Sequence, residues 1–257
     1  GMCVLSGSLK AKEADQEWNP SKETMEKTMK NKVILFKLST IVMEMSGFSD
    51  NGAFLGVYGL ASYLDTKGYD AYVCECRADQ AIDYLKKFNR SEICGIGFSV
   101  DFENKHVAQK IGATITEVYD IPVIIGGPEA ISLDEAYLRK SRARAIIRGE
   151  GELALVAVLD AIKENRSMDD IPGIFYINEE NACIDRGESP VVENLDELPF
   201  PAYDKSITPI DFKSLYLMTS RGCPYHCVFC HEGALKRPMR QRSVENVIAE
   251  MKYFLLK

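Results

Sequence analysis

Apolar and polar positions follow two patterns along most of the chain, one typical of strands and one typical of helices. From Lys32 onward, apolar runs of strand length alternate with amphipathic runs of helix length. The predicted strands are Val33–Thr40, Ala71–Cys76, Ile93–Ser99, Pro122–Ile125 and Ala145–Arg148. The predicted helices are Ala53–Lys67, Asp79–Phe88, Phe102–Tyr119, Leu133–Lys140 and Glu152–Glu164. Five such units in a row indicate a parallel sheet covered on both faces, because each helix must return the chain across the sheet.

The predicted fold class is therefore α/β, with an open, doubly wound, five-stranded parallel sheet over residues 32–170. Ligands of such sheets bind beyond the carboxyl ends of the strands. Two glycine motifs fall at that edge: Gly126-Gly127 follows the fourth strand, and Gly149 and Gly151 follow the fifth. Each motif alone is also compatible with a tight turn. Glu150 and Glu152, at a helix start, are explained by the helix dipole.

Outside this unit the rhythm changes. Residues 1–31 are polar and charged and predict a flexible tail, whereas residues 171–213 predict a small hairpin followed by a proline-rich linker. The hairpin strands are expected at Gly173–Asn178 and Ala182–Asp185. Residues 214–257 predict the start of a second domain, with a strand at Leu215–Thr219 and a final helix whose N-terminus Ser243 can cap.

Composition narrows the class of protein. The formal net charge of -7 argues against a broad nucleic-acid surface, which needs a concentrated basic face. No apolar run approaches the roughly 20 residues of a membrane helix, and no signal peptide is recognisable, so a cytoplasmic location and no membrane contact are expected. One basic run, Lys236, Arg237, Arg240 and Arg242, is expected to be a solvated surface, with contact to an anionic substrate as the minority interpretation.

The eight cysteines are unevenly spaced. Cys74 and Cys94 lie in apolar strand-like runs and are expected to be small buried hydrophobes. Cys223, Cys227 and Cys230, by contrast, fall within the stretch "SRGCPYHCVFCHEG" as C-x3-C-x2-C. So dense a run in a chain of this size indicates metal or redox chemistry.

Two metal centres compete for these three thiolates. Zinc would need a fourth ligand, which His226 or His231 could supply. An iron–sulfur cluster held by three cysteines would leave one iron open for a small molecule. The spacing favours the cluster and leaves zinc as the alternative.

A strand leading into "SRGCP" and C-x3-C-x2-C, with Phe229 before the last cysteine, resembles the cluster loop of the radical S-adenosylmethionine (SAM) superfamily. The resemblance implies that Cys223, Cys227 and Cys230 bind a [4Fe–4S] cluster and that SAM chelates its open iron. Reductive cleavage of SAM would then give a 5′-deoxyadenosyl radical. Phe229 would lie near the adenine, and the two histidines of the loop would be ordinary loop residues.

The preceding unit resembles the cobalamin (B12)-binding domain of one branch of that superfamily. The stretches "NGAFLGVYGLASYLDTKGYDAYV", "IIGGPEA", "IIRGEGE" and "LDELPFPAYD" look like its landmarks in their usual order. Ala53 stands where related cobalamin domains carry a cobalt-ligating histidine, and Asp101 replaces a leucine, so any cobalamin is expected to bind without a histidine lower ligand. The residues implied to contact cobalamin are Asn51, Ala53, Ser99, Gly126, Gly127, Gly149 and Gly151.

The resemblance implies part of a cobalamin-dependent radical SAM enzyme, most often a methyltransferase in this branch. It would act on an unidentified small molecule or peptide with a flavodoxin- or ferredoxin-type reductant. Residues from Ser214 onward supply only the first βα unit of a barrel needing on the order of 180 residues, so the domain is expected to be truncated and the chain alone inactive. The alternative is an α/β module that binds cobalamin or a protein partner, with an inert or zinc-binding cysteine stub. A methylthiotransferase is disfavoured because Cys74, Cys76 and Cys94 lack the arrangement of a second cluster.

Overall fold

The protein was analysed as a computed structural model. The structure describes residues 30–39, 54–209, 215–225, 227–230 and 237–255. Most of the predicted tail (1–31) lies outside the described residues, as do Asn51, Ala53, His226 and His231.

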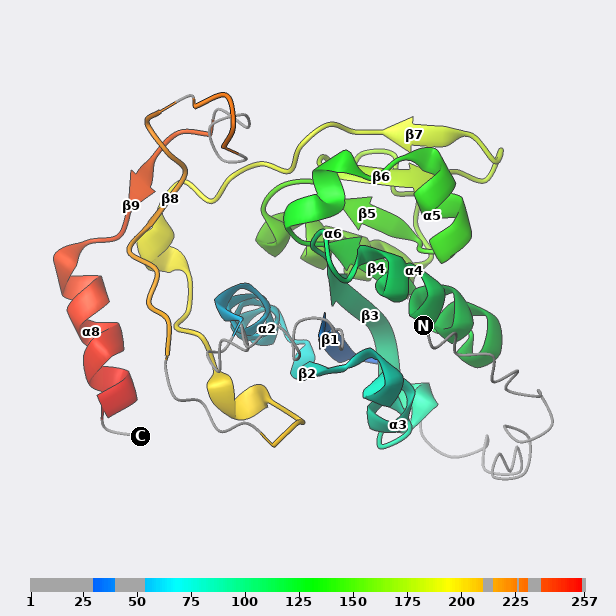
Figure 1. Ribbon diagram of the computed structural model, residues 1–257, viewed down its shortest axis with the longest axis horizontal. Helices are drawn as coiled ribbons and strands as arrows, with labels where there is room; N and C mark the ends of the chain where they lie inside the picture. The colour runs from blue at the N-terminus through cyan, green and yellow to red at the C-terminus, as the bar shows by residue number, and fades with distance from the viewer. Residues whose placement is uncertain (1–29, 40–53, 210–214, 226, 231–236, 256–257) are drawn as a thin grey trace, which may run out of the picture.

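A seven-stranded sheet forms the centre of the molecule, in the order β2-β1-β3-β4-β5-β6-β7 (Figure 1). Its first five strands are parallel. Strand order reverses between β1 and β3, as expected for a doubly wound sheet of the flavodoxin-like order. The strands are β1 Lys32–Ser39, β2 Asp70–Arg77, β3 Ile93–Ser99, β4 Val123–Gly126, β5 Ala145–Ile147, β6 Ile174–Ile177 and β7 Cys183–Asp185.

The prediction of five strands was too small by two. The hairpin assigned to the linker region is present, but its first strand, β6, pairs antiparallel with β5, and β7 pairs with β6. The hairpin therefore extends the sheet, because the outer edge of β5 offers unpaired backbone groups that β6 satisfies. At the opposite edge, Ile207 N donates to Val73 O of β2 (2.9 Å), so a segment of the linker runs along that edge.

Helices cover both faces of the sheet. Apolar residues alternate along β1, so Val33 and Leu35 face one apolar core while Ile34 and Phe36 face the other. The first core is closed by α2 Leu55–Thr66 and α6 Gly151–Glu164. The second is closed by α3 Ala81–Leu85, α4 Lys105–Thr114 and α5 Glu135–Ser141. Within the described residues, no helix is both long and apolar enough to cross a membrane.

Two predicted helices, those that became α3 and α4, are shorter than expected. The one predicted at Phe102–Tyr119 begins at Lys105, because Asp101 Oδ1 accepts hydrogen bonds from the backbone N–H groups of Glu103 and Asn104 (both 3.0 Å) and holds a turn there. It then continues as a π-helical turn, Ile115–Tyr119. The remaining short turns are 3₁₀ helices at Ala78–Gln80, Arg90–Glu92, Pro128–Ser132, Leu195–Glu197 and Tyr203–Lys205.

The strand predicted at Leu215–Thr219 is wrong, since those residues are irregular. Pairing starts one residue later: β8 Ser220–Arg221 pairs antiparallel with β9 Arg240–Gln241, on the far side of the cysteine loop. The two strands form a separate two-stranded sheet that joins the ends of that loop (Figure 1).

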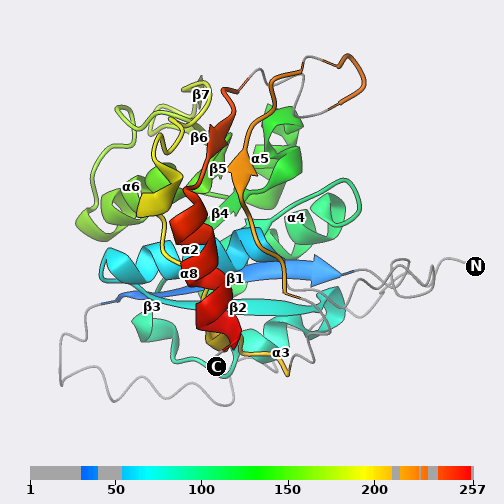
Figure 2. The ribbon, with the colours of Figure 1, turned by 90° about the vertical axis from the view of Figure 1, so that its left-hand side faces the viewer.

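The last helix, α8 Val244–Leu255, begins as predicted, because Ser243 Oγ accepts a hydrogen bond from Asn246 N (3.1 Å). It lies along the outside of the molecule, with residues of the linker between it and α2 (Figures 1 and 2). The rings of Phe254 and Tyr203 lie 5.2 Å apart, and Tyr203 in turn contacts Tyr58 of α2 at 4.9 Å. Several apolar residues of the helix remain exposed: Val244, Ile248, Met251 and Leu255.

Candidate functional site

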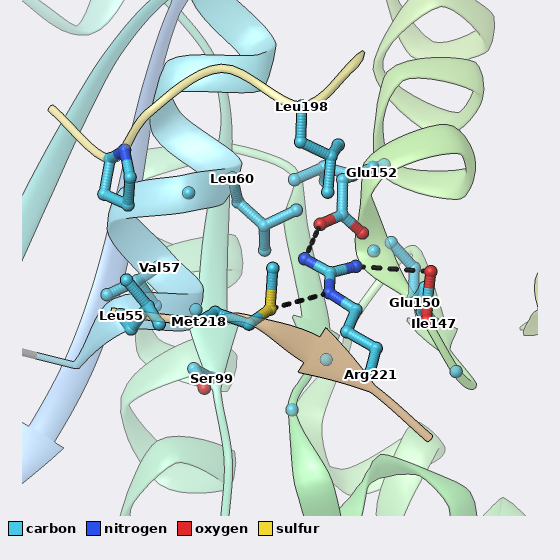
Figure 3. A pocket seen from close by; sticks show the side chains of 18 of the residues that line it. Leu55, Val57, Leu60, Ser99, Ile147, Glu150, Glu152, Leu198, Met218 and Arg221 are labelled. Carbon is cyan, nitrogen blue, oxygen red and sulfur yellow. Dashed lines mark hydrogen bonds and ion pairs between the residues drawn. The ribbon is translucent and has the colours of Figure 1, made fainter. Parts of the chain in front are cut away.

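A cavity of about 540 Å³ opens at the carboxyl edge of the parallel strands. This volume falls within the roughly 300–1,000 Å³ of ligand sites. Its floor comes from β1, β3, β4 and β5, its sides from α2 and α6, and its roof from the proline-rich linker and the segment that carries β8 (Figure 3). Leu55, Leu60 and Leu198 project into it, so much of the lining is apolar (Figure 3).

Several residues that the sequence singled out lie at this cavity. All five of the described residues implied for cobalamin in the N-terminal unit line it: Ser99, Gly126, Gly127, Gly149 and Gly151. They lie at the ends of β3, β4 and β5, where the topology of the sheet directs a ligand. The other two, Asn51 and Ala53, lie outside the described residues.

The glycines at the cavity have different physical roles. Gly127 has φ +100°, and a Cβ built there would lie 2.6 Å from Val100 N, so only glycine fits. Gly126 has no such constraint, since a Cβ there would meet no atom within 4 Å. Gly56 and Gly59 of α2 also line the cavity and likewise face open space. Sequence reasoning did not select Gly56 and Gly59 as cavity residues, although their spacing of three places both on one face of the helix.

Arg221, which directly precedes Gly222 and Cys223, crosses the cavity wall to the N-terminus of α6 (Figure 3). Its Nη2 donates to Glu152 Oε1 (2.6 Å), and its Nη1 lies 3.2 Å from Glu150 Oε2. Burial alone would lower the pKa of Arg221, but the two carboxylates raise it overall. This cluster ties the cysteine-bearing segment to the α/β unit.

Glu150 has a second cationic partner. Arg240 of β9, only 8% exposed, donates to Glu150 through both Nη atoms and to Val192 O (2.6 Å). Burial raises the pKa of Glu150, but the hydrogen bonds from Arg240 and Val192 N and the charge of Arg221 outweigh it, so the pKa lies below its ordinary value. The helix dipole, which the sequence suggested for the two glutamates of this motif, is therefore only part of their role.

The basic run is not the solvated surface that was predicted. Besides the buried Arg240, Arg242 is inserted between Met218 O (2.8 Å), Asn246 and Glu250. Arg237 pairs with the more exposed Glu188 at 2.9 Å. Lys236 lies outside the described residues. Carboxylates of the same chain therefore neutralise Arg237, Arg240 and Arg242. Most of these carboxylates lie far away in the sequence, so periodicity does not reveal the pairs.

Asp101, the residue in place of a leucine, also has a charged partner. Lys37, at the end of β1 and 5% exposed, donates to Asp101 Oδ2 and lies 4.5 Å from the ring centre of Phe54. Burial raises the pKa of Asp101, but the hydrogen bonds from Lys37 and the backbone of Asn104 bring it below its ordinary value. Sequence reasoning did not select Lys37, which stands between Phe36 and Leu38 in a mostly apolar strand.

The three clustered cysteines lie on the loop between β8 and β9. Cys223 and Cys230 are partly buried, Cys227 is exposed, and Cys230 N donates to Cys227 O (3.0 Å) in a turn. Phe229 is 90% exposed. In the part of the chain that is described, no three His, Cys, Asp or Glu side chains gather closely enough to hold a metal ion. Three thiolates are a suitable set of ligands for an iron–sulfur cluster. In the described structure, however, the three thiols do not converge on one point.

Cys74 and Cys94 lie where the sequence predicted them. Cys74 and Cys94 are buried, and burial raises the pKa of the Cys94 thiol to about 12. Cys94 faces one core, and Cys74 and Cys76 face the other, so these three thiols lie on opposite faces of the sheet and cannot share a second cluster. His106 is exposed on α4.

Comparison with known sequences gives relatives but no family model, since none matches the chain. An uncharacterised methyltransferase of Pyrococcus horikoshii is 31% identical over 238 residues, which cover 88% of this chain and 50% of the relative. Cytidylyl-2-hydroxyethylphosphonate methyltransferase of Streptomyces wedmorensis is 26% identical over 67% of this chain and 39% of its own length. The chain thus spans half or less of the length of these relatives.

Solved structures agree with these relatives. The cobalamin-dependent SAM radical enzyme OxsB, with aqua-cobalamin and SAM bound, matches with a TM-score of 0.71 and 26% identity over 86% of this chain and 31% of its own. The radical SAM methyltransferase TsrM of Kitasatospora setae shares the fold with a TM-score of 0.66 over 89% of this chain and 46% of its own, at 19% identity. Fold, cavity and relatives together place the chain in the family of cobalamin-dependent radical SAM proteins.

Proposed function

We propose that the chain binds cobalamin in the cavity at the carboxyl edge of its sheet, as part of a radical SAM methyltransferase. The observation that carries this proposal is the lining of the cavity. It contains every described residue that the resemblance implied for cobalamin: Ser99, Gly126, Gly127, Gly149 and Gly151. Gly56, Gly59 and Gly126 leave open space, so a flat and bulky molecule can approach the backbone there.

The protein residues would hold cobalamin by shape and backbone contact. His106, the one histidine among the described residues, is exposed on α4, away from the cavity lining. Ala53, in the position of the ligating histidine, has no donor atom. We therefore expect the cobalt to have no histidine below it.

Cys223, Cys227 and Cys230 would hold the [4Fe–4S] cluster, which supplies the electron for cleavage of SAM. The chain positions this loop through residues on either side of it. Gly222 has φ +80°, and a Cβ there would lie 2.3 Å from Pro238 O, so glycine allows β8 to turn into the loop. Arg221 ties the same turn to Glu150 and Glu152 beside the cavity.

Methyl transfer is supported by the names of the relatives, two of which are methyltransferases. Since the chain spans half or less of their length, we propose cofactor binding for this chain and methyl transfer for a protein of full length. A flavodoxin- or ferredoxin-type reductant would supply electrons, and the substrate would be a small molecule or peptide.

The test is anaerobic reconstitution with iron and sulfide, followed by addition of hydroxocobalamin. We expect an iron–sulfur absorption band that is lost in Cys223→Ala and cobalamin binding that both proteins retain. The protein is then labelled with ¹⁵N-histidine, and the bound cobalamin is reduced to the Co(II) form. Its electron paramagnetic resonance spectrum should show no coupling of the unpaired electron on cobalt to a ¹⁵N nucleus. Failure of the wild-type protein to bind cobalamin would contradict the proposal.

The alternative function is a cobalamin- or partner-binding module whose cysteines are inert or hold zinc. The observation behind its inert form is that Cys227 is exposed and that no three His, Cys, Asp or Glu side chains among the described residues lie close enough to share a metal ion. Stoichiometric zinc in protein purified without oxygen, together with no iron after reconstitution, would support this alternative.

A further inference from the structure

The two ends of the cysteine loop form part of the cavity wall. Among the described residues, those before and after the loop that line the cavity are Met218, Ser220, Arg221, Gly222, Arg237 and Arg242. The three clustered cysteines are not among the described lining residues. A ligand in the cavity can therefore contact the segments that carry the loop without contacting its thiols.

Arg221 connects the cavity with the loop. In the backbone, only Gly222 separates it from Cys223. Its side chain lines the cavity, is 22% exposed and reaches the N-terminus of α6, where it pairs with Glu150 and Glu152 (Figure 3). The side chains of these two glutamates are only 8% and 6% exposed. Arg221 is therefore the member of these ion pairs that solvent reaches most easily.

The ion pairs are the strong attachments of the Arg221 side chain. Its Nε points at Met218 Sδ (3.1 Å), and a thioether is a weak acceptor. The attachment to α6 thus depends on how strongly the guanidinium and the two carboxylates attract each other. Water weakens this attraction, whereas a bulky ligand that displaces water lowers the local dielectric constant and strengthens it. A ligand that fills the cavity should therefore hold β8 more firmly against α6.

The cysteine loop has to be ordered before it can hold a cluster. Among the described residues, the thiols of Cys223, Cys227 and Cys230 do not converge on one point. Bringing them together costs conformational entropy. Less entropy remains to be lost when the first residue of the loop is already fixed, so two ligands that order the same segment bind cooperatively.

We propose that Arg221 is a positioning residue that couples cobalamin binding in the cavity to assembly of the three thiolates. Occupancy of the cavity shields the ion pairs of Arg221 with Glu150 and Glu152 and so fixes the start of the cysteine loop. This inference rests on the proposed function, since it links the sites of its two cofactors. Such a link is reciprocal, so a cluster in the loop raises the affinity for cobalamin by the same factor by which cobalamin raises the affinity for the cluster.

The experiment compares the wild type with Arg221→Gln, Arg221→Lys and a control, Arg166→Gln, which removes an exposed ion pair with Glu164. The probe is cyanocobalamin, whose cyanide protects the cobalt from the free thiols of the metal-free chain. Its dissociation constant is measured anaerobically before and after reconstitution with iron and sulfide, with circular dichroism to verify folding. Amide hydrogen exchange at residues 218–223 is measured in the metal-free proteins with and without saturating cyanocobalamin.

We expect the reconstituted wild type to bind cyanocobalamin about tenfold more tightly than the metal-free wild type. In Arg221→Gln this ratio should fall below about twofold, because a neutral amide forms no ion pair. Arg221→Lys should restore part of the ratio, since lysine keeps the charge but not the fork of the guanidinium. Cyanocobalamin should slow exchange at residues 218–223 at least about fivefold in the wild type and in Arg166→Gln, and less than about twofold in Arg221→Gln.

Equal affinity of the metal-free and the reconstituted wild type would overturn the inference while leaving the proposed function in place. A ratio that Arg221→Gln retains would also overturn it, because the link would then run through other residues of the wall. If the wild type assembles no cluster, the exchange measurement decides alone: cyanocobalamin that binds without slowing exchange at residues 218–223 would contradict the inference. If the wild type bound no cyanocobalamin at all, the proposed function itself would fail.

Discussion

Gly126 and Gly127 stand side by side at the end of β4 and meet different constraints. Gly127 needs its left-handed backbone and its close contact with Val100, whereas Gly126 adjoins open space at the cavity. The sequence predicted both as a cofactor motif, but it could not separate a glycine required by the fold from one available to a ligand. The separation depends on the backbone of the loop after β3, which lies opposite Gly127 alone.

Alanine scanning of this pair should show the difference in the free energy of unfolding. Gly127→Ala should destabilise the protein by about 3 kcal/mol, because it combines a positive φ with a contact to backbone that cannot move aside. Gly126→Ala should change the free energy of unfolding by less than about 1 kcal/mol. Urea titration at neutral pH measures both values, and equal destabilisation by the two changes would contradict the assignment.

Glu150 makes stability depend on pH. Its pKa in the folded protein lies below the roughly 4.3 of an unfolded glutamate, so its ion pairs contribute fully above about pH 5 and are lost as pH falls through the folded value. Glu150→Gln should therefore cost about 3 kcal/mol at pH 7 and less as pH falls below about 4. Urea unfolding of both proteins between about pH 7 and 3 measures this difference.

The pair of Arg237 with the more exposed Glu188 provides the control. Glu188→Gln should cost at most about 1 kcal/mol at pH 7, since solvent screens this ion pair. A cost of Glu150→Gln that stays constant across the acidic range, or that increases on acidification, would argue against ionised Glu150 as the acceptor for Arg240 and Arg221.

Among the elements, the five βα units could be predicted because each one shows its burial locally, through continuous apolar strands and amphipathic helices. The position of the hairpin was also predicted correctly. Its pairing with β5 was not predicted, because the sequence of a strand does not specify which strand it pairs with. The strand predicted at Leu215–Thr219 failed for a related reason: an apolar run suggested it, whereas backbone pairing with β9 begins only at Ser220.

Two arginines attach the β8–β9 pair to α6, and their removal should loosen this attachment. In Arg221→Gln/Arg240→Gln, amide hydrogen exchange should become at least about tenfold faster at residues 218–222, while exchange in β1 and β3 remains unchanged. Arg166→Gln, which removes an exposed pair with Glu164, is the control and should change neither region. Unchanged exchange at residues 218–222 in the double variant would show that other contacts hold the segment.

For the whole molecule, the cavity is made from parts that are far apart in the chain. Ser99 and Gly126 come from the sheet, Leu198 from the linker, Arg221 from the cysteine segment and Glu250 from the last helix. The sheet-edge residues could be predicted, because the topology of a doubly wound sheet fixes where strands end. The charged residues could not, because their positions depend on contacts between segments that only the folded chain brings together.

The most direct test of the central claim is the binding of hydroxocobalamin to the wild-type chain and to Gly126→Leu, measured by absorbance after gel filtration. A Cβ at this position would meet no atom within 4 Å, so we expect the variant to fold normally and its side chain to occupy the cavity. We predict that the wild type retains about one equivalent of cobalamin and that Gly126→Leu binds at least about tenfold more weakly. No retention by the wild type, or equal affinity of the two folded proteins, would contradict binding of cobalamin in this cavity.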